Sequence, residues 1–158
     1  MKKFFVGMLT ALMLMGCSPA VKYERSTEMG TLNQITFDEM YEKMENKETF
    51  MFAFTQESCQ NCLYFKEEIL SEYIVDHGFD YYEIVLTVTQ EDLERATAFV
   101  KQHPNPEDQT PEGFEVTDVL TPTFYFVEDG ELKDIYVGVP TEKDFDALIV
   151  KYRLDEVK

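Results

Sequence analysis

The chain has 158 residues, which is enough for one domain and a leader segment. Hydrophobic residues make up 44% of it and aromatic residues 14%, so the composition can supply a globular core. The formal net charge is −17, and such an acidic surface excludes nucleic acid as a partner and repels anionic lipid headgroups. The acidic residues are scattered and form no loop of the EF-hand type, so we interpret them as the solvated surface of an exposed domain.

Residues 1–16 have the pattern of a signal peptide. A basic start, Met1–Lys3, is followed by an uncharged, mostly apolar stretch, Phe4–Gly16, that is shorter than the about 20 residues of a membrane-spanning helix. The stretch ends in Leu14-Met15-Gly16-Cys17, which resembles the lipobox of bacterial lipoproteins. The resemblance implies cleavage before Cys17, lipidation of its side chain, and attachment to the extracytoplasmic face of the cell membrane. A plain secretion signal followed by a coincidental cysteine is the alternative.

If Cys17 carries a lipid, Cys59 and Cys62 are the two remaining thiols, in a compartment that permits disulfide chemistry. The stretch after the cleavage site is polar and contains a proline and a glycine. We therefore predict a lipidated tether over residues 17–33 and a single domain over residues 34–158.

The first predicted elements of the domain are a helix and a buried strand. Thr36 to Glu39 has the pattern of a capping box, and apolar residues recur at helical spacing after it, which predicts a helix to about Lys47. Phe50–Phe54 is a continuous apolar run, typical of a central strand that is buried on both faces.

A second helix is expected after Cys59, and it should end near Gly78. Leu63, Leu70 and Ile74 lie on one of its faces, with Cys62, Ile69 and Tyr73 beside them. We next expect a strand over Tyr81–Val88 and a third helix that opens at Thr89–Asp92. This helix should bury Leu93, Ala96, Thr97 and Val100, and it should end at Pro104 and Pro106.

The last part of the chain predicts a loop, a hairpin and a helix. Asn105–Gly113 is polar and acidic, and Asp129-Gly130 lies between two strand-like runs, Thr123–Val127 and Leu132–Val137. Thr141 and Asp144 then have the spacing of a helix cap. The order of elements predicts an α/β sandwich with a mixed sheet.

The two nearby cysteines stand where a helix begins. Cys59 follows a buried strand after a short loop, and the first turn of a helix offers free N–H groups and the positive end of the helix dipole, which favour a thiolate. Cysteines in such positions have pKa values of about 3.5–7.5 instead of about 8.5. We expect Cys59 to be the nucleophile and Cys62, one turn later, to resolve the mixed disulfide.

Two other interpretations of the pair are less well supported. A structural zinc site needs four ligands, and the chain offers no second cysteine pair and only two histidines, His77 and His103. A purely structural disulfide across two residues would constrain the unfolded chain little. We therefore predict a redox-active pair that requires neither a metal nor an organic cofactor.

A second motif, Thr121-Pro122-Thr123, stands directly before a predicted strand. Together with the strand, the CxxC helix, the hairpin and the last helix, it makes residues 34–155 resemble the thioredoxin superfamily. The resemblance implies a thioredoxin-like sandwich, a central mixed β-sheet flanked by helices. It also implies that Pro122 is cis and faces Cys59, and that the backbone of Thr121 binds the substrate chain. The segment Ile35–Phe54 followed by Cys-Gln-Asn-Cys is similar to bacteriocin-transport-accessory-like thioredoxins of Gram-positive bacteria.

The chain departs from thioredoxins around the cysteine pair. It has no tryptophan, and Ala53 stands where thioredoxins keep a buried aspartate. The nearest acid, Glu57, could relay protons through water, but it is interpreted as a solvated loop residue. Lys66 could stabilise a thiolate electrostatically, but it is interpreted as a solvated helix lysine. The neutral Gln60-Asn61 between the cysteines argues against a strong oxidant, since a histidine there would stabilise the thiolate.

These features predict a membrane-anchored, extracytoplasmic thiol–disulfide oxidoreductase. Its substrates would be protein dithiols or disulfides, and a membrane redox protein would be its electron partner. The alternative is a non-catalytic accessory or binding lipoprotein with the same fold, which serves peptide or bacteriocin export.

Overall fold

The computed structural model describes residues 23–87 and 89–157. The predicted signal peptide, the predicted lipidation site Cys17 and the first part of the predicted tether lie outside the described residues. Along the described chain the elements are β1 (Thr31–Gln34), α1 (Phe37–Glu45), β2 (Phe50–Thr55), α2 (Gln60–Tyr64), the π-helical η1 (Phe65–Leu70), α3 (Ser71–Tyr73), β3 (Asp80–Val85), α4 (Gln90–Gln102), the short 3₁₀ helix η2 (Glu107–Gln109), β4 (Thr123–Glu128), β5 (Glu131–Val137) and α5 (Glu142–Lys151).

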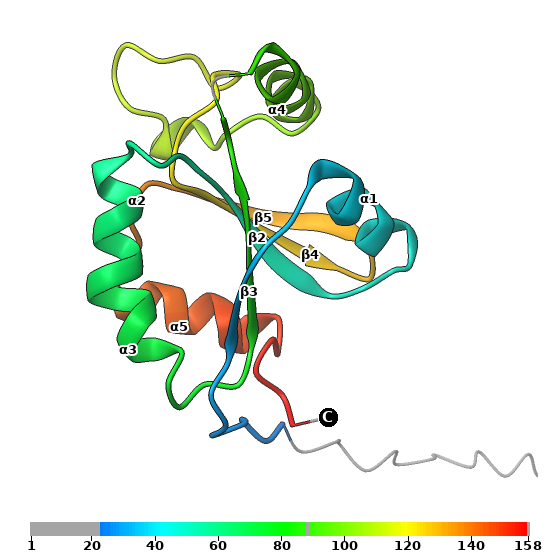
Figure 1. The fold of residues 1–158 in the computed structure, drawn as a ribbon, viewed down its shortest axis with the longest axis vertical. Helices are drawn as coiled ribbons and strands as arrows, with labels where there is room; N and C mark the ends of the chain where they lie inside the picture. Colours follow the sequence, from blue (N-terminus) through cyan, green and yellow to red (C-terminus); the bar gives the residue numbers. More distant parts are fainter. Residues whose placement is uncertain (1–22, 88, 158) are drawn as a thin grey trace, which may run out of the picture.

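The strands form one mixed sheet in the order β1-β3-β2-β4-β5 (Figure 1). β1, β3 and β2 run parallel to one another. β4 is antiparallel to β2, and β5 is antiparallel to β4. α1 and α4 pack on one face of the sheet, and α2, α3 and α5 pack on the other. The predicted α/β sandwich with a central mixed sheet is confirmed. None of the helices among the described residues is both long and apolar enough to cross a membrane.

β2 is the central strand, and every one of its residues is buried. Phe50, Phe52 and Phe54 face the core under α1 and α4, whereas Met51 and Ala53 face the core under α2, α3 and α5. The rings of Phe52 and Tyr125 stack at 4.9 Å between centroids, so β2 and its neighbour β4 are joined by aromatic packing as well as by hydrogen bonds. The predicted two-sided burial of this strand is confirmed.

The predicted hairpin also forms, between β4 and β5. Asp129 and Gly130 both have positive φ, 52° and 78°, which is the conformation of a type I′ turn. A Cβ on Gly130 would lie 2.1 Å from the carbonyl oxygen of Met44, so the turn can pack against the end of α1 only if this residue is glycine.

The helical segment after Cys59 buries Leu70, Cys62 and Tyr73 as predicted, but it does not bury Leu63. α2, η1 and α3 are continuous from Gln60 to Tyr73, and the buried residues are Cys62, Phe65, Leu70 and Tyr73. The five-residue step from Phe65 to Leu70 is the spacing of a π turn, whose wider coil shifts the register of the buried face. Leu63, which was expected in the core, is therefore 37% exposed. In α4 the expectation for Leu93 is also wrong, because Phe99 is buried and Leu93 lies at the surface.

Part of the stretch predicted as a tether lies against the domain. Thr31–Gln34 forms the edge strand β1, and Arg25 binds two carboxylates near the C-terminus. Its Nε donates to Asp155 at 2.7 Å and its Nη2 to Asp146 at 2.6 Å. Asp155 is fully buried and also accepts a hydrogen bond from the hydroxyl of Tyr23. The N-terminal segment is thus held to the C-terminal one by polar contacts around the buried Asp155, which hydrophobic periodicity does not indicate.

This contact predicts a stability effect for Arg25→Ala. The substitution leaves the buried Asp155 without its cationic partner, and we expect a loss of about 1.5–3 kcal/mol in the free energy of unfolding. Urea denaturation followed by circular dichroism measures it. The control is Lys133→Ala, which breaks only an exposed pair with Glu131 and should change stability by less than about 0.5 kcal/mol. Equal effects of the two substitutions would contradict the assignment.

The same cluster predicts a dependence of stability on pH. Burial opposes ionisation of Asp146, but hydrogen bonds from Arg25 and Tyr73 outweigh it and hold the pKa of the carboxyl below its usual value. The resulting stabilisation is present above the unfolded pKa of about 3.9 and is lost as the pH falls through the lower folded pKa. Between pH 6 and pH 3 we therefore expect Asp146→Asn to lose less stability than the wild-type protein, as measured by urea midpoints at each pH.

Candidate active site

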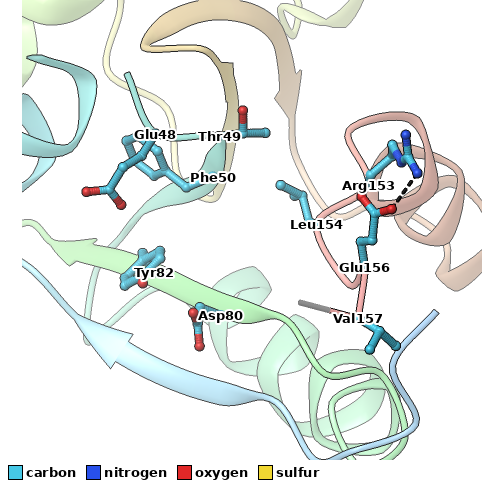
Figure 2. A pocket seen from close by; sticks show the side chains of 9 residues that line it. All are labelled: Glu48, Thr49, Phe50, Asp80, Tyr82, Arg153, Leu154, Glu156 and Val157. Atoms are coloured by element: carbon cyan, nitrogen blue, oxygen red, sulfur yellow. Dashed lines mark hydrogen bonds and ion pairs between the residues drawn. The ribbon is translucent and has the colours of Figure 1, made fainter. Parts of the chain in front are cut away.

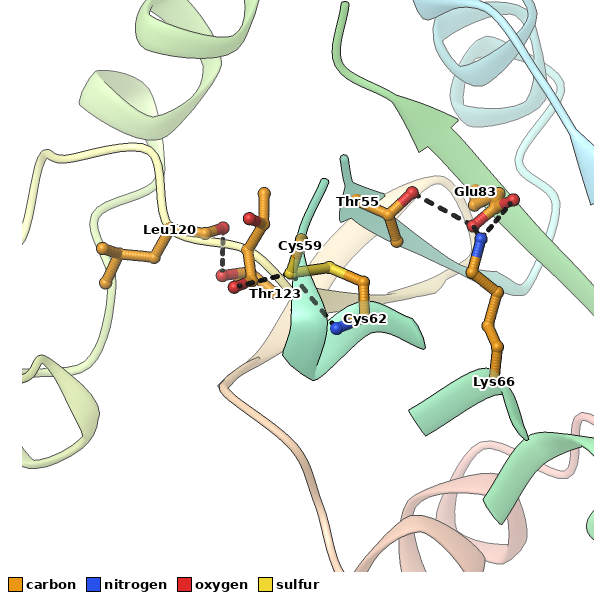
Figure 3. Close-up of a disulfide and its surroundings, with 8 residues drawn as sticks. Thr55, Cys59, Cys62, Lys66, Glu83, Leu120 and Thr123 are labelled. Atoms are coloured by element: carbon orange, nitrogen blue, oxygen red, sulfur yellow. Dashed lines mark hydrogen bonds and ion pairs between the residues drawn. A yellow bond between two sulfur atoms is a disulfide. The ribbon is translucent and has the colours of Figure 1, made fainter. Parts of the chain in front are cut away.

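Cys59 and Cys62 form a disulfide at the start of the α2 helix (Figure 3). Their Cα atoms are 5.2 Å apart, within the ordinary range for a disulfide. Cys59 is the N-cap residue, and its Sγ accepts a hydrogen bond from the backbone N–H of Cys62 at 3.1 Å. Cys62 is only 1% exposed, whereas Cys59 is partly exposed. The two sulfurs are therefore unequal, and Cys59 is the one that a partner molecule can reach.

The second predicted motif lies directly beside Cys59. The carbonyl oxygen of Thr121 is 3.5 Å from the Cys59 Sγ, and the Thr121–Pro122 peptide bond is cis. Pairing of Thr123 in β4 with Phe54 in β2 explains the contact, because it brings the residues before β4 to the loop that follows β2. Cys59, Cys62, Thr121 and Pro122 are thus brought together by the sheet, although about 60 residues separate the two motifs.

The segment before this motif is held by hydrogen bonds within itself and by one to β5. Asn105 is buried; its backbone N–H donates to Val116, and its side-chain amide donates to the carbonyl of Asp118 at 2.8 Å. Gln109 accepts a hydrogen bond from the backbone N–H of Val137, so the segment also satisfies the free edge of β5. The predicted polar loop is therefore tied both to the residues just before the Thr121–Pro122 motif and to β5.

A partly buried ion pair joins the helical segment that carries the cysteines to β3, and it was not predicted from the sequence. Glu83 in β3 is 5% exposed; the Nζ of Lys66 donates to its two carboxylate oxygens at 2.9 and 3.1 Å. The hydroxyl of Thr55, the last residue of β2, donates to the same carboxylate at 3.0 Å. The interpretation of Lys66 as a solvated lysine is wrong, because its side chain reaches inward to this carboxylate (Figure 3).

The sequence carried one signal of this pair, a glutamate inside an otherwise apolar and aromatic strand. The strand register places Glu83 directly opposite Ala53, the position at which a buried acid was missing. Glu57, the nearest acid in sequence, is exposed. The buried carboxylate of this site thus comes from the neighbouring strand.

Other parts of the described surface offer no comparable chemistry. A pocket of about 340 Å³ lies between the C-terminal segment and the first residues of β2 and β3, at the end of these strands away from the disulfide (Figure 2). Arg153 and Glu156 pair with each other at its rim. Within residues 23–87 and 89–157, no group of three or more histidine, cysteine, aspartate or glutamate side chains is placed to hold a metal ion.

Comparison with protein families gives a match over residues 37–153 to the model of the thioredoxin-like domain. The chain belongs to this thioredoxin-like family. Among solved structures, it is similar to the thioredoxin of Malassezia sympodialis, with 14% identity, a TM-score of 0.50, and coverage of 80% of this chain and 96% of that one. It is equally similar to thioredoxin f2 of Chlamydomonas reinhardtii, with 14% identity, a TM-score of 0.50, and coverage of 77% and 96%. A search among curated proteins found no match.

The comparisons and the geometry agree on the general chemistry. A thioredoxin-like fold with a CxxC-spaced pair that closes into a disulfide fits a thiol–disulfide oxidoreductase. The structural likeness, at 14% identity, shows the fold alone. The assignment of chemistry therefore depends on the cysteine pair and its surroundings.

The unequal burial of the cysteines predicts unequal reactivity. After reduction, iodoacetamide should alkylate Cys59 faster than Cys62 by about tenfold or more, because Cys59 lies at the helix start and Cys62 is enclosed. Mass spectrometry of peptides from a quenched time course measures both rates. Equal rates, or faster alkylation of Cys62, would contradict the assigned roles.

Proposed function

We propose that this protein is a membrane-anchored, extracytoplasmic thiol–disulfide oxidoreductase that acts on protein substrates. The observation that carries the proposal is the pair of unequal sulfurs at one helix start, with the accessible one beside the Thr121–Pro122 backbone. The same arrangement can transfer electrons in either direction. The redox partner proposed for it is a membrane protein that supplies or removes two electrons.

In the reducing direction, the Cys59 thiolate attacks a substrate disulfide. A bond forms between Cys59 and one substrate sulfur, and the other substrate sulfur leaves as a thiolate. The Cys62 thiolate then attacks Cys59, so that the internal disulfide forms and the second substrate sulfur leaves. Two electrons have passed from the cysteine pair to the substrate, and the oxidising direction is the reverse of these steps.

The proposed roles of Thr121 and Pro122 follow from their position. The Thr121 carbonyl lies 3.5 Å from the sulfur of the partly exposed Cys59, and Thr121 is itself partly exposed, so a backbone N–H of an extended substrate chain could donate to this carbonyl. Pro122 is buried and has no N–H, so it offers no competing donor there. Main-chain recognition of this kind suits an enzyme that accepts several protein substrates.

The membrane attachment is proposed from the sequence. The Leu14–Cys17 motif supplies a lipidation site, and a covalent lipid suits a domain whose net negative charge repels anionic headgroups. Anchoring outside the cytoplasm would keep the cysteine pair in a compartment where disulfides persist.

A trapping experiment tests the proposed reaction. In Cys62→Ala the second step is lost, so mixed disulfides between Cys59 and its substrates should accumulate in cells and disappear on reduction. Non-reducing gels and mass spectrometry detect them, and the Cys59→Ala/Cys62→Ala double variant is the control. Complete absence of trapped species in Cys62→Ala would favour a non-catalytic accessory protein with a resting disulfide.

A second experiment tests the anchor. Cys17→Ala removes the lipidation site, and we expect the protein to move from the membrane fraction to the soluble extracytoplasmic fraction. Immunoblots of separated fractions measure this. Unchanged membrane association of Cys17→Ala would contradict lipid anchoring and leave the redox chemistry untouched.

A further inference from the structure

We propose that the substrates of this protein carry their reactive cysteine in a cationic, apolar segment, which binds a groove and an acidic rim beside Cys59. The proposal rests on the proposed function, because it names the class of protein on which the cysteine pair acts. The starting observation is an open groove of about 380 Å³ next to the loop that carries the accessible sulfur. Its lining residues are Gln56, Glu57, Ser58, Leu86, Thr87 and Leu93.

One wall of the groove is the loop that leads into Cys59. Ser58 directly precedes Cys59, and the backbone N–H of Cys59 donates to the carbonyl of Gln56 at 3.2 Å, which closes the loop into a turn. Because the side chain of Ser58 is small, it leaves the groove open on this side. A substrate chain whose cysteine reaches Cys59 therefore brings the neighbours of that cysteine to the groove.

The other walls of the groove are fixed by hydrogen bonds. The N–H of Leu86 donates to the carbonyl of Thr55 at 2.8 Å, so the residues after β3 are tied to the end of β2. The hydroxyl of Thr87 donates to Asp92 in the first turn of α4. Leu93, the next residue of α4, is 38% exposed. The groove is thus formed before a substrate binds, and an apolar side chain of the substrate would cover Leu93.

The surroundings of the groove are acidic. Glu57 lies in its wall and is exposed. The segment between α4 and β4 carries five more exposed carboxylates, which are Glu107, Asp108, Glu112, Glu115 and Asp118. Within residues 23–87 and 89–157, none of these six carboxylates takes part in an ion pair. Glu57 and these five residues form the acidic rim.

The acidic rim approaches Cys59 along two stretches of chain. Glu57 is two residues before Cys59, and Asp118 is three residues before Thr121. The carbonyl oxygen of Thr121 lies 3.5 Å from the Cys59 Sγ. Three residues span at most about 11 Å, so both carboxylates are near enough to attract a substrate bound at Cys59 in dilute salt.

Basic residues do not offset this negative charge. Lysine and arginine are absent from residues 48–65, 67–94 and 102–132. Of the three basic residues between these stretches, Lys66 and Arg95 are held in ion pairs, and Lys101 is in the last turn of α4. The surface around Cys59 is therefore complementary in charge to a cationic chain, and it repels an acidic one.

Positive charge on the substrate also assists the exchange itself. A lysine or arginine beside the substrate cysteine stabilises its thiolate, and a thiol of lower pKa is the better leaving group. Nearby carboxylates disfavour a further negative charge on Cys59, and a cationic chain offsets this effect. Charge and the apolar groove would thus select a class of substrate, whereas contacts to the substrate backbone are independent of its sequence.

The test uses the reduced full-length protein and short synthetic peptides that carry one cysteine as a mixed disulfide with 5-thio-2-nitrobenzoate. The Cys59 thiolate attacks the peptide sulfur, a bond forms between these two sulfurs, and 5-thio-2-nitrobenzoate leaves as a coloured thiolate. The peptides have leucine or serine on both sides of the cysteine, and lysine, glutamine or glutamate outside these. Each rate constant is divided by that of 2-mercaptoethanol with the same peptide, which removes differences in the intrinsic reactivity of the disulfides.

The rates should depend on both features of the peptide. With leucine beside the cysteine, we expect the lysine peptide to react about tenfold faster than the glutamate peptide in about 0.01 M salt, with the glutamine peptide between them. This ratio should fall towards one in about 1 M salt, because the charges are then screened. With lysine outside, the leucine peptide should react about fivefold faster than the serine peptide, because the groove takes up the apolar side chain.

Variants then assign the two preferences to their residues, in about 0.1 M salt, where charges act over about 10 Å. Glu57→Lys should reduce the lysine-to-glutamate ratio about threefold or more. Its matched control is Glu72→Lys, which makes the same change at an exposed position of α3 and should leave the ratio unchanged. Leu93→Ser should abolish the preference for leucine and keep the preference for lysine. Circular dichroism verifies folding, and Glu57→Lys, in an exposed loop, decides if Leu93→Ser does not fold.

The outcomes separate this inference from the proposed function. Equal normalised rates for the lysine and glutamate peptides in dilute salt would overturn it, and so would equal effects of Glu57→Lys and Glu72→Lys. Equal rates for the leucine and serine peptides would overturn the role of the groove. Failure of the wild-type protein to release any 5-thio-2-nitrobenzoate would refute the proposed oxidoreductase itself, and this inference with it.

Discussion

The register of β2 between β3 and β4 is the constraint on which the site depends. β2 is buried along its whole length, so a shift by one residue would exchange its two apolar faces and disrupt both cores. Pairing with β4 fixes Thr121 and Pro122 beside the loop after β2, and pairing with β3 fixes Glu83 beneath the helix that follows. Thr121 therefore lies against Cys59, and Glu83 contacts Thr55 and Lys66 on either side of the cysteine pair in sequence, because one strand has a single stable position.

The environment on the two sides of the disulfide differs in polarity. Cys59 is partly exposed and lies beside the backbone carbonyl of Thr121, which suits contact with a second chain. Cys62 is enclosed, and the Lys66–Glu83 ion pair lies on its side of the disulfide (Figure 3). This asymmetry is what a two-step exchange requires, since one sulfur must meet the substrate and the other must act only after the mixed disulfide has formed. Our account of the protein as an oxidoreductase rests on this difference more than on the spacing of the cysteines.

Local signals in the sequence predicted much of the fold. The capping box at Thr36, the apolar run of β2, the Asp129-Gly130 turn and the position of Cys59 each depend on neighbouring residues, and each is present in the structure. The general α/β sandwich follows from their order. The contact between Cys59 and the Thr121–Pro122 motif came from the resemblance to thioredoxins, since no local pattern links the two.

The features that were missed depend on contacts between distant residues. β1 is a polar edge strand, so no apolar alternation indicates it. The π turn between Phe65 and Leu70 breaks the helical period from which the buried face was predicted. Lys66 and Glu83 are ordinary surface residue types, and although Glu83 stands in an apolar strand, no local pattern indicates that Lys66 on the next helical segment reaches it. A strand register and a π turn are set by packing of the whole core.

The central claim is that the Cys59–Cys62 disulfide is a working redox couple rather than a permanent crosslink. Equilibration of the protein with glutathione buffers of graded potential, followed by thiol trapping and mass spectrometry, measures its reduction potential directly. Our account predicts a two-electron transition between dithiol and disulfide at a potential above about −300 mV. A disulfide that persists through the whole series, with a potential below about −300 mV, is the behaviour of a structural crosslink and would contradict the account.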